Sequence, residues 1–201
     1  MMRVAVLASG RGTNFARLLE AEGTGELGEA QIVLLGTDRA CPAADLALTR
    51  GVPVYIADAK SDGMSEWERG FLAAAAEHRV DALVLAGFMR ILSASFVERY
   101  AGRILNVHPS LLPAFPGRDA IGQALRHGVR VTGVTVHLVD ETLDGGPIVL
   151  QEAVEVWHGE DPEQLAQRIH AVEHRLLPLA VRMLAEGQLS IHGRQVSILE
   201  G

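Results

Sequence analysis

The sequence has very little cysteine and almost no lysine. Cys41 is the only cysteine among 201 residues, so the chain can form neither an internal disulfide nor a cysteine metal cluster. This scarcity suits a reducing cytoplasm, where we expect the protein to be located. Of the 18 basic residues, Lys60 is the only lysine, and it lies in a polar, turn-like stretch. A Schiff-base mechanism therefore has almost no candidate amine.

Long apolar segments and an excess of positive charge are also absent. Apolar runs such as residues 82–86 and 133–136 fall far short of the roughly 20 residues that cross a bilayer, so we expect no membrane association. The net charge is -7 and the pI is near 5.6, whereas general nucleic-acid binding needs a basic surface. We therefore expect no nucleic-acid partner, and any anionic ligand must be held by local hydrogen-bond donors.

Short apolar runs alternate with amphipathic stretches over the first two thirds of the chain. The runs are rich in Val, Ile and Leu and are bounded by Gly, Pro, Asp or Ser. They predict strands at residues 3–8, 31–36, 52–56, 81–86 and 103–107, with helices near 13–21, 41–50, 65–78 and 93–100. This alternation predicts an α/β fold, a doubly wound and mostly parallel sheet with helices on both faces and right-handed crossovers.

The pattern changes after a predicted helix at residues 119–127. Strand-like runs at 131–140 and 147–156 are joined by a loop at 141–146, a spacing that suits an antiparallel hairpin. A last helix opens with Asp161 as its N-cap and Pro162 at its first position, and Pro178 should kink it. Its apolar positions form one stripe that we expect to be buried: Leu165, Ile169, Val172, Leu176, Leu179 and Met183.

The first predicted strand ends in a glycine-rich turn, residues 9–14, just before a helix. Closely spaced glycines let consecutive backbone N–H groups point at an anion, so this turn is a candidate phosphate site. A plain tight turn is the simpler alternative. A dinucleotide site is another, since Asp38 after the second strand could bind a ribose, but Phe15 replaces the third glycine of that motif and the lysine of a P-loop is missing.

Two further strand ends carry unusual residues. The fourth strand runs into residues 85–92, where Arg90 stands among apolar residues that alone would indicate core; it could contact an anionic ligand or a buried carbonyl.

At the end of the fifth strand, Asn106 and His108 are two residues apart and should face the same way. An amide donor beside an imidazole suits a tetrahedral oxyanion. Asp144, in the hairpin loop, could favour the protonated imidazole, although a glycine-flanked aspartate is also a common turn residue.

Taken together, residues 9–14, 85–92, 106–113 and 143–147 resemble the phosphoribosylglycinamide formyltransferase family in order and spacing, over nearly the whole chain. The motif H-P-S-L-L-P with an upstream asparagine and a downstream L-D-x-G is typical of folate-dependent formyltransferases in general. The run L-A-G-F-M-R-I-L narrows the resemblance to the purine branch and the formyltetrahydrofolate hydrolases. It implies transfer of a formyl group from 10-formyltetrahydrofolate, the co-substrate, to the amine of glycinamide ribonucleotide in purine (IMP) biosynthesis, without a metal.

The resemblance also implies a Rossmann-like domain over residues 1–201, with a phosphate-binding half at 1–100, a catalytic and folate-binding half at 101–201, a C-terminal antiparallel hairpin and a long C-terminal helix. The implied catalytic residues are Asn106, His108 and Asp144. The implied ribonucleotide-binding residues are Gly12, Thr13, Asn14 and Glu173. The implied folate-binding residues are Met89, Arg90, Ile91, Leu92, Asp140 and Asn106.

In the implied reaction the free amine attacks the formyl carbon, and the amide of Asn106 and a protonated His108 stabilise the oxyanion. Asp144 keeps His108 charged and helps to move a proton through water. Four positions depart from the family's usual pattern: Asp38, Met64, Ala114 and Asp119. We expect these departures to alter the loop at 114–119 and the affinity for the glutamate tail of the donor.

Several rival functions share parts of this pattern. The nearest are a formyltetrahydrofolate hydrolase and a formyltransferase acting on methionyl-tRNA or a sugar nucleotide. The hydrolases usually carry an extra N-terminal domain and the tRNA enzymes a C-terminal barrel, and we expect neither here. A dinucleotide-binding domain is the alternative of a different class. The remaining histidines suggest no metal site, although His170 and His174 lie one helical turn apart. His137 alternates with Thr135 on a strand and could face the cleft, but a core or surface position is expected. A monomer or a homodimer fits the sequence equally well.

Overall fold

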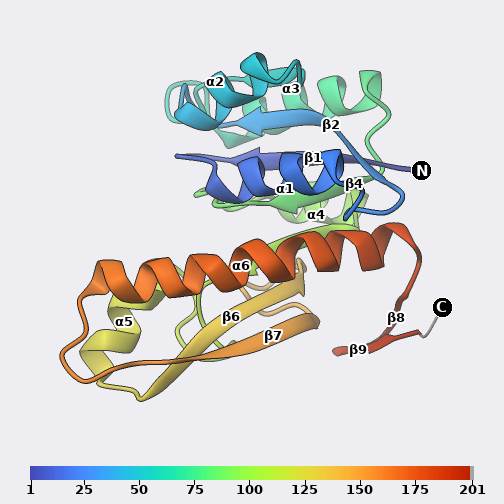
Figure 1. Ribbon diagram of the computed structural model, residues 1–201. Coiled ribbons are helices and arrows are strands. Elements are labelled where there is room, and N and C mark those ends of the chain that lie inside the picture. Colours follow the sequence, from blue (N-terminus) through green and yellow to red (C-terminus); the bar gives the residue numbers. More distant parts are fainter. Residues whose placement is uncertain (200–201) are drawn as a thin grey trace.

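The computed structural model of the protein describes residues 1–199. A seven-stranded sheet runs through it, with helices packed against its strands (Figure 1). The strand order is β3-β2-β1-β4-β5-β6-β7. The strands of this sheet are β1 (Met2–Ala8), β2 (Ala30–Thr37), β3 (Val54–Ile56), β4 (Ala82–Leu85), β5 (Ile104–His108), β6 (Val131–Leu138) and β7 (Ile148–Glu155). The helices are α1 (Thr13–Gly23), α2 (Pro42–Thr49), α3 (Met64–Glu77), α4 (Ala94–Arg99), α5 (Ala120–His127) and α6 (Pro162–Ala185).

The sheet is parallel from β3 to β5 and antiparallel beyond it. β2 pairs in parallel with β1 and β3, and β4 pairs in parallel with β1 and β5. β6 then pairs antiparallel with β5, and β7 with β6. The prediction of a doubly wound, mostly parallel sheet with an antiparallel hairpin and a long last helix is confirmed.

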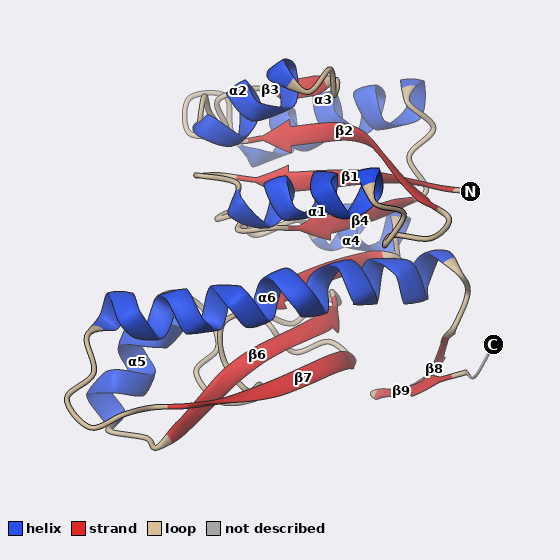
Figure 2. Ribbon diagram, in the orientation of Figure 1, coloured by secondary structure: helices blue, strands red, loops and turns tan. Residues whose placement is uncertain are grey.

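Helices cover both faces of the sheet because the central strands are apolar on both sides. Along β1, Val4 and Val6 belong to one core with α1, α2 and α6, whereas Ala5 and Leu7 belong to a second core with α3 and α4. Figure 2 shows α1 and α6 in front of the strands and α4 behind them. Strands buried on both faces lose the polar alternation of a half-exposed strand, as the sequence indicates.

The long helix α6 begins as expected and buries a slightly different stripe. The Asp161 carboxylate caps it by accepting a hydrogen bond from the Glu163 N–H at 2.7 Å, and Pro178 lies inside the helix without ending it. The predicted stripe is buried as far as Leu176, but Leu179 is 41% exposed. Burial continues instead at Ala180, four residues after Leu176, because the 3.6-residue period moves the buried face along the helix.

A second, two-stranded sheet follows α6. β8 (Leu189–His192) pairs antiparallel with β9 (Gln195–Ile198), and this hairpin was not predicted. Both strands are short and largely exposed, so they lack the apolar run that marks a strand in sequence. No helix within residues 1–199 is long and apolar enough to cross a membrane.

Candidate active site

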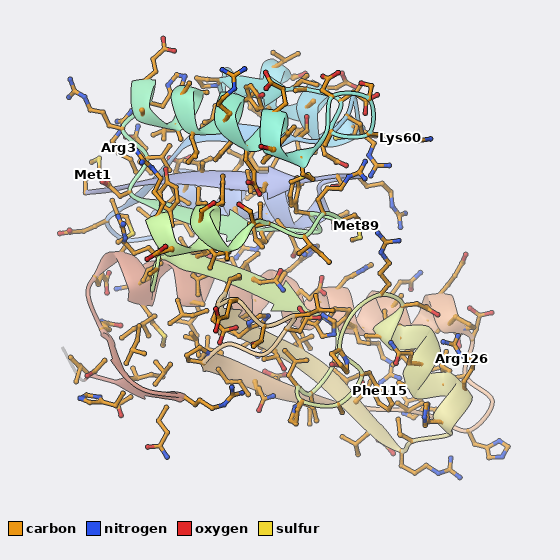
Figure 3. The ribbon with its side chains drawn as sticks, turned by 180° about the vertical axis from the view of Figure 1, so that it is seen from behind. Met1, Arg3, Lys60, Met89, Phe115 and Arg126 are labelled. Atoms are coloured by element: carbon orange, nitrogen blue, oxygen red, sulfur yellow. The ribbon has the colours of Figure 1, made fainter. Side chains whose placement is uncertain are left out.

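A cleft of about 930 Å³ opens at the carboxyl ends of β1, β4 and β5. This is the edge where ligands bind in open α/β sheets. In Figure 3, Met89 and Phe115 both lie toward this edge of the molecule. The cleft is lined by residues 10–14, 86–91, 106–109, 117–121 and 143–144 and by His170 and Glu173 of α6.

The glycine turn places the start of α1 on the wall of the cleft. Gly12 is the N-cap of this helix and has a φ of 73°, a left-handed conformation that glycine adopts without strain. No side chain caps this helix end, and Gly12, Thr13 and Asn14 all line the cleft. Backbone N–H groups at the positive end of a helix are suited to bind an anion.

Asn14 and Glu173 meet at the base of this wall. The Asn14 side-chain amide donates a hydrogen bond to the Glu173 carboxylate at 2.9 Å, and both side chains are buried. Burial raises the pKa of Glu173 above its ordinary value, against the lowering effect of the Asn14 hydrogen bond and the charges of His170 and His108. The side-chain oxygen of Asn14 is buried without a hydrogen-bond partner among residues 1–199. The pair therefore presents both a carboxylate and a free acceptor beside the cleft.

Asn106, His108 and Asp144 converge in the cleft. The Asp144 Oδ1 lies 3.4 Å from the Asn106 amide nitrogen, and its Oδ2 lies 3.5 Å from Nδ1 of His108. Asp144 itself is fixed by the Gly117 N–H, which donates to Oδ2 at 2.7 Å. Asp144 is 38 residues from Asn106 in the sequence, yet the three side chains share one small volume.

Shorter hydrogen bonds hold Asn106 and His108 on their other sides. Nε2 of His108 donates to the backbone carbonyl of Phe115 at 2.8 Å, since a carbonyl can only accept. The Asn106 amide nitrogen lies 3.0 Å from Nε2 of His137. Contacts of 3.4 and 3.5 Å are at the weak limit of hydrogen bonding. The bonds to Phe115 and His137 therefore orient the two side chains, and the contacts to Asp144 are the ones that can rearrange around a ligand.

His137 is buried, one of the positions expected for it, and is a direct neighbour of Asn106. The two residues are opposite each other in the antiparallel pairing of β5 and β6. Nδ1 of His137 lies 2.9 Å from the Leu138 carbonyl, so Nδ1 carries a hydrogen. Burial lowers the pKa of His137, against the raising effects of Leu138 and Asp144. A neutral His137 therefore accepts the Asn106 amide at Nε2.

The loop after β4 forms another wall of the cleft. Met89, Arg90 and Ile91 line it, and Met89 and Ile91 are exposed. Leu92 packs against the second core instead. Asp140 does not line the cleft either, because it accepts hydrogen bonds from the backbone and hydroxyl of Thr142 in its own loop.

Asp38 is fully buried, which argues against the dinucleotide alternative. Its carboxylate accepts hydrogen bonds from Arg90 at 2.7 Å and from Arg39 at 3.0 Å. A carboxylate that binds a ribose hydroxyl must face the ligand, and Asp38 does not line the cleft.

The other departures from the motif have structural roles. Asp119 caps α5 by accepting from the Gly122 N–H at 3.2 Å and pairs with Arg126 at 2.9 Å. Met64 packs against the second core, and Ala114 donates its N–H to the Leu111 carbonyl. Within residues 1–199 no group of three or more His, Cys, Asp or Glu side chains is arranged to hold a metal ion.

Comparison with known proteins adds independent findings. Residues 2–181 match the formyl transferase family. The chain is 45% identical over 197 residues to phosphoribosylglycinamide formyltransferase of Mycobacterium tuberculosis, covering 98% of this chain and 91% of the relative. The crystal structure of glycinamide ribonucleotide transformylase 1 from Symbiobacterium toebii superposes with a TM-score of 0.95 at 41% identity, over 100% of this chain and 95% of the other. A formyltetrahydrofolate deformylase from Pseudomonas syringae superposes with a TM-score of 0.91 at 26% identity, over 100% of this chain and 67% of the other.

Proposed function

The chain belongs to the formyl transferase family, among the phosphoribosylglycinamide formyltransferases of purine biosynthesis. On this basis we propose which ligands it binds and how its residues act. The donor is 10-formyltetrahydrofolate and the acceptor is the amine of glycinamide ribonucleotide. One observation supports the assignment of the catalytic centre: the Asp144 carboxylate lies between the Asn106 amide and the His108 imidazole. These side chains are in a cleft that has the uncapped N-terminus of α1, suited to bind a phosphate, on one wall.

The acceptor occupies the side of the cleft formed by α1 and α6. The backbone N–H groups at Gly12, Thr13 and Asn14 hold the phosphate, because an uncapped helix start offers donors and a favourable dipole. Glu173 binds a polar group of the ribonucleotide. The buried, unpartnered oxygen of Asn14 supports this assignment, since a donor on the ligand would satisfy it.

The donor occupies the side formed by the loop after β4. Met89, Arg90 and Ile91 surround the pterin, and the exposure of Met89 and Ile91 supports this role, because a flat apolar ligand would cover both side chains. Leu92 and Asp140 contribute indirectly. Leu92 anchors this loop in the second core and Asp140 stabilises the loop that leads to Asp144.

Chemistry takes place where the two ligands meet. The unprotonated amine of the acceptor attacks the formyl carbon, a carbon–nitrogen bond forms, and the carbonyl oxygen becomes an oxyanion. The Asn106 amide and a protonated His108 donate to this oxygen. Each offers the N–H that faces Asp144 across a weak contact of 3.4 or 3.5 Å, so donating to an oxyanion leaves the shorter hydrogen bonds to His137 and Phe115 in place.

Collapse of the tetrahedral intermediate completes the transfer. The attacking nitrogen loses a proton, which Asp144 accepts through water, and the bond between the formyl carbon and N10 of the folate breaks. Asp144 releases this proton back through water to N10, so the products are the formylated ribonucleotide and tetrahydrofolate. The protein's groups end in their starting protonation states, and no covalent enzyme intermediate forms.

The direct test is an assay with 10-formyl-5,8-dideazafolate, following loss of its formyl group with and without glycinamide ribonucleotide. Loss that depends on the acceptor supports transfer. The structural likeness to a formyltetrahydrofolate deformylase makes hydrolysis the second candidate. Equal loss of the formyl group in the absence of the acceptor would establish hydrolysis and overturn the proposal.

We also propose that the enzyme is cytoplasmic, consists of one domain and acts as a monomer or a homodimer. The single cysteine, Cys41, supports a reducing compartment. Light scattering at assay concentration distinguishes a monomer from a homodimer.

A further inference from the structure

A buried carboxylate outside the proposed catalytic centre lies directly behind the donor-binding loop. Asp38 follows β2 and is fully buried. Its backbone is fixed from two directions: the indole N–H of Trp67 donates to the carbonyl of Thr37 at 2.9 Å, and the Ala59 N–H donates to the carbonyl of Asp38 at 3.2 Å. Asp38 is therefore held by the core packing of α3, independently of any ligand.

The first connection from Asp38 to the loop is an ion pair. Nε of Arg90 donates to Oδ2 of Asp38 at 2.7 Å, and the Arg90 side chain is 27% exposed while that of Asp38 is fully buried. The guanidinium thus reaches from the cleft wall into the interior. A carboxylate out of contact with water strongly favours retaining such a partner, because an unpaired buried charge is costly.

The second connection passes through Ser9 at the end of β1. The Met89 N–H donates to the hydroxyl oxygen of Ser9 at 2.9 Å, and the Ser9 N–H donates to the Gly87 carbonyl at 3.2 Å. Burial raises the pKa of Asp38, but hydrogen bonds from Ser9, Arg39 and Arg90 outweigh this and hold it below its ordinary value. The Ser9 hydroxyl thus accepts a hydrogen bond from the loop and is a neighbour of the Asp38 carboxylate, whose pKa it helps to lower.

Arg39 provides an internal comparison. It also binds Asp38, at 3.0 Å through Nη2, but its side chain is 49% exposed and it does not line the cleft. Arg39 and Arg90 thus both help to neutralise the same carboxylate. Only Arg90 belongs to the loop that faces the donor.

We propose that Asp38 is a positioning residue for the donor: through Arg90 and through Ser9 it holds residues 87–91 against the glycine turn in the shape that receives the folate. This inference rests on the proposed function of that loop. The carboxylate touches neither ligand. The ion pair with Asp38 holds the side chain of Arg90, and Ser9 holds the backbone N–H of Met89. The loop is therefore formed before the donor arrives.

The test uses Asp38→Asn, which keeps the size of the side chain and removes its charge. With 10-formyl-5,8-dideazafolate and glycinamide ribonucleotide as substrates, we expect the donor KM to rise about tenfold, while kcat and the acceptor KM stay within about threefold, as for a loss of ground-state binding. Fluorescence titration with the same folate should show the same rise in Kd. The matched control, Arg39→Gln, should leave the donor KM unchanged.

A double-mutant cycle separates positioning from a merely structural role. If Asp38 acts through Arg90, adding Asp38→Asn to Arg90→Gln should raise the donor KM no further. If the two substitutions instead raise the donor KM independently, so that their effects multiply, the inference is overturned. It is also overturned if Asp38→Asn lowers the Tm but leaves the donor KM unchanged. If Asp38→Asn does not fold, Ser9→Ala breaks the Met89 connection alone and should still raise the donor KM. Absence of folate binding by the unmodified protein would instead contradict the proposed function.

Discussion

The side-chain nitrogen of Asn106 lies 3.0 Å from Nε2 of His137, an atom that carries no hydrogen because the other ring nitrogen donates to the Leu138 carbonyl. This contact determines which end of the Asn106 amide faces Asp144. If the amide were turned over, its oxygen would face the bare nitrogen of His137, and two acceptors would meet. A neutral His137 therefore selects the orientation in which Asn106 offers an N–H to the cleft.

The orientation of Asn106 should be important for the rate of transfer. His137→Ala leaves the Asn106 amide without its acceptor, so we expect kcat to fall about tenfold, equivalent to the roughly 1.4 kcal/mol that one hydrogen bond contributes. Both KM values should stay within about threefold, because His137 does not line the cleft. Steady-state kinetics with both substrates measure the effect, and His158→Ala, at an exposed loop position, is the control. A normal kcat would show that Asn106 is oriented by other contacts.

The lowered pKa of His137 predicts how stability depends on pH. As the pH falls below the ordinary histidine value of 6.5, His137 in the unfolded chain binds a proton while the buried residue does not, so the free energy of unfolding decreases. His137→Gln removes this contribution and should flatten the decrease between pH 6.5 and the lower pKa of the folded state. Urea unfolding of both proteins across that range measures it, and parallel curves would contradict it.

The two proposed oxyanion donors should be far more important for the rate than for stability. Asn106→Ala and His108→Ala should each lower kcat at least a hundredfold, because removing one such donor typically costs on the order of 2.7–4 kcal/mol of barrier. Circular dichroism should show that both variants stay folded. Near-normal rates in either variant would remove that residue from the mechanism.

Much of the fold could be predicted because its signals are local. Apolar runs bounded by turn residues predicted all seven strands of the main sheet, and Asp161 with Pro162 predicted the start of α6. The β8–β9 hairpin was missed because its strands are short and exposed. The stripe on α6 was wrong at Leu179, since a spacing of three or four residues fits two adjacent faces of a helix.

The site could be predicted only where its geometry is local. Alternation along β5 places Asn106 and His108 on one side, whatever the rest of the chain does. The position of Asp144 depends on the loop after β6 and on the Gly117 N–H, neither of which has a local signal. The contact of His137 with Asn106 was not predicted for a similar reason, because it depends on the register of β6 against β5. Sequence alternation shows only that His137 shares a face of its strand with Thr135.

Glu173 should strengthen binding of the acceptor but lower the stability of the protein at neutral pH. Burial raises the pKa of Glu173 above the ordinary glutamate value of 4.5. Above pH 4.5 the carboxyl group therefore ionises more readily in the unfolded chain than in the folded protein. The free energy of unfolding decreases as the pH rises toward and through the pKa of the folded state. Glu173→Gln removes this loss and keeps an acceptor for Asn14. We expect a higher Tm at pH 7, an unchanged Tm at pH 4, and an acceptor KM raised about tenfold. Glu77→Gln, on an exposed face of α3, is the control, and a lower Tm at pH 7 would contradict the prediction.

Gly12 should be indispensable for two separable reasons. A Cβ at this position would lie 2.7 Å from the Cβ of Ala43, and its φ of 73° is strained for any residue with a side chain. Gly12→Ala should therefore lower stability by more than the roughly 1–2 kcal/mol of left-handed strain alone. Gly25→Ala measures that strain without a clash, because Gly25 has a φ of 78° and open space around it. Relief of the clash must push α1 away from α2, so Gly12→Ala should also raise the acceptor KM, whereas Gly25→Ala should leave it unchanged. Equal effects of the two substitutions on the acceptor KM would show that the start of α1 does not hold the phosphate.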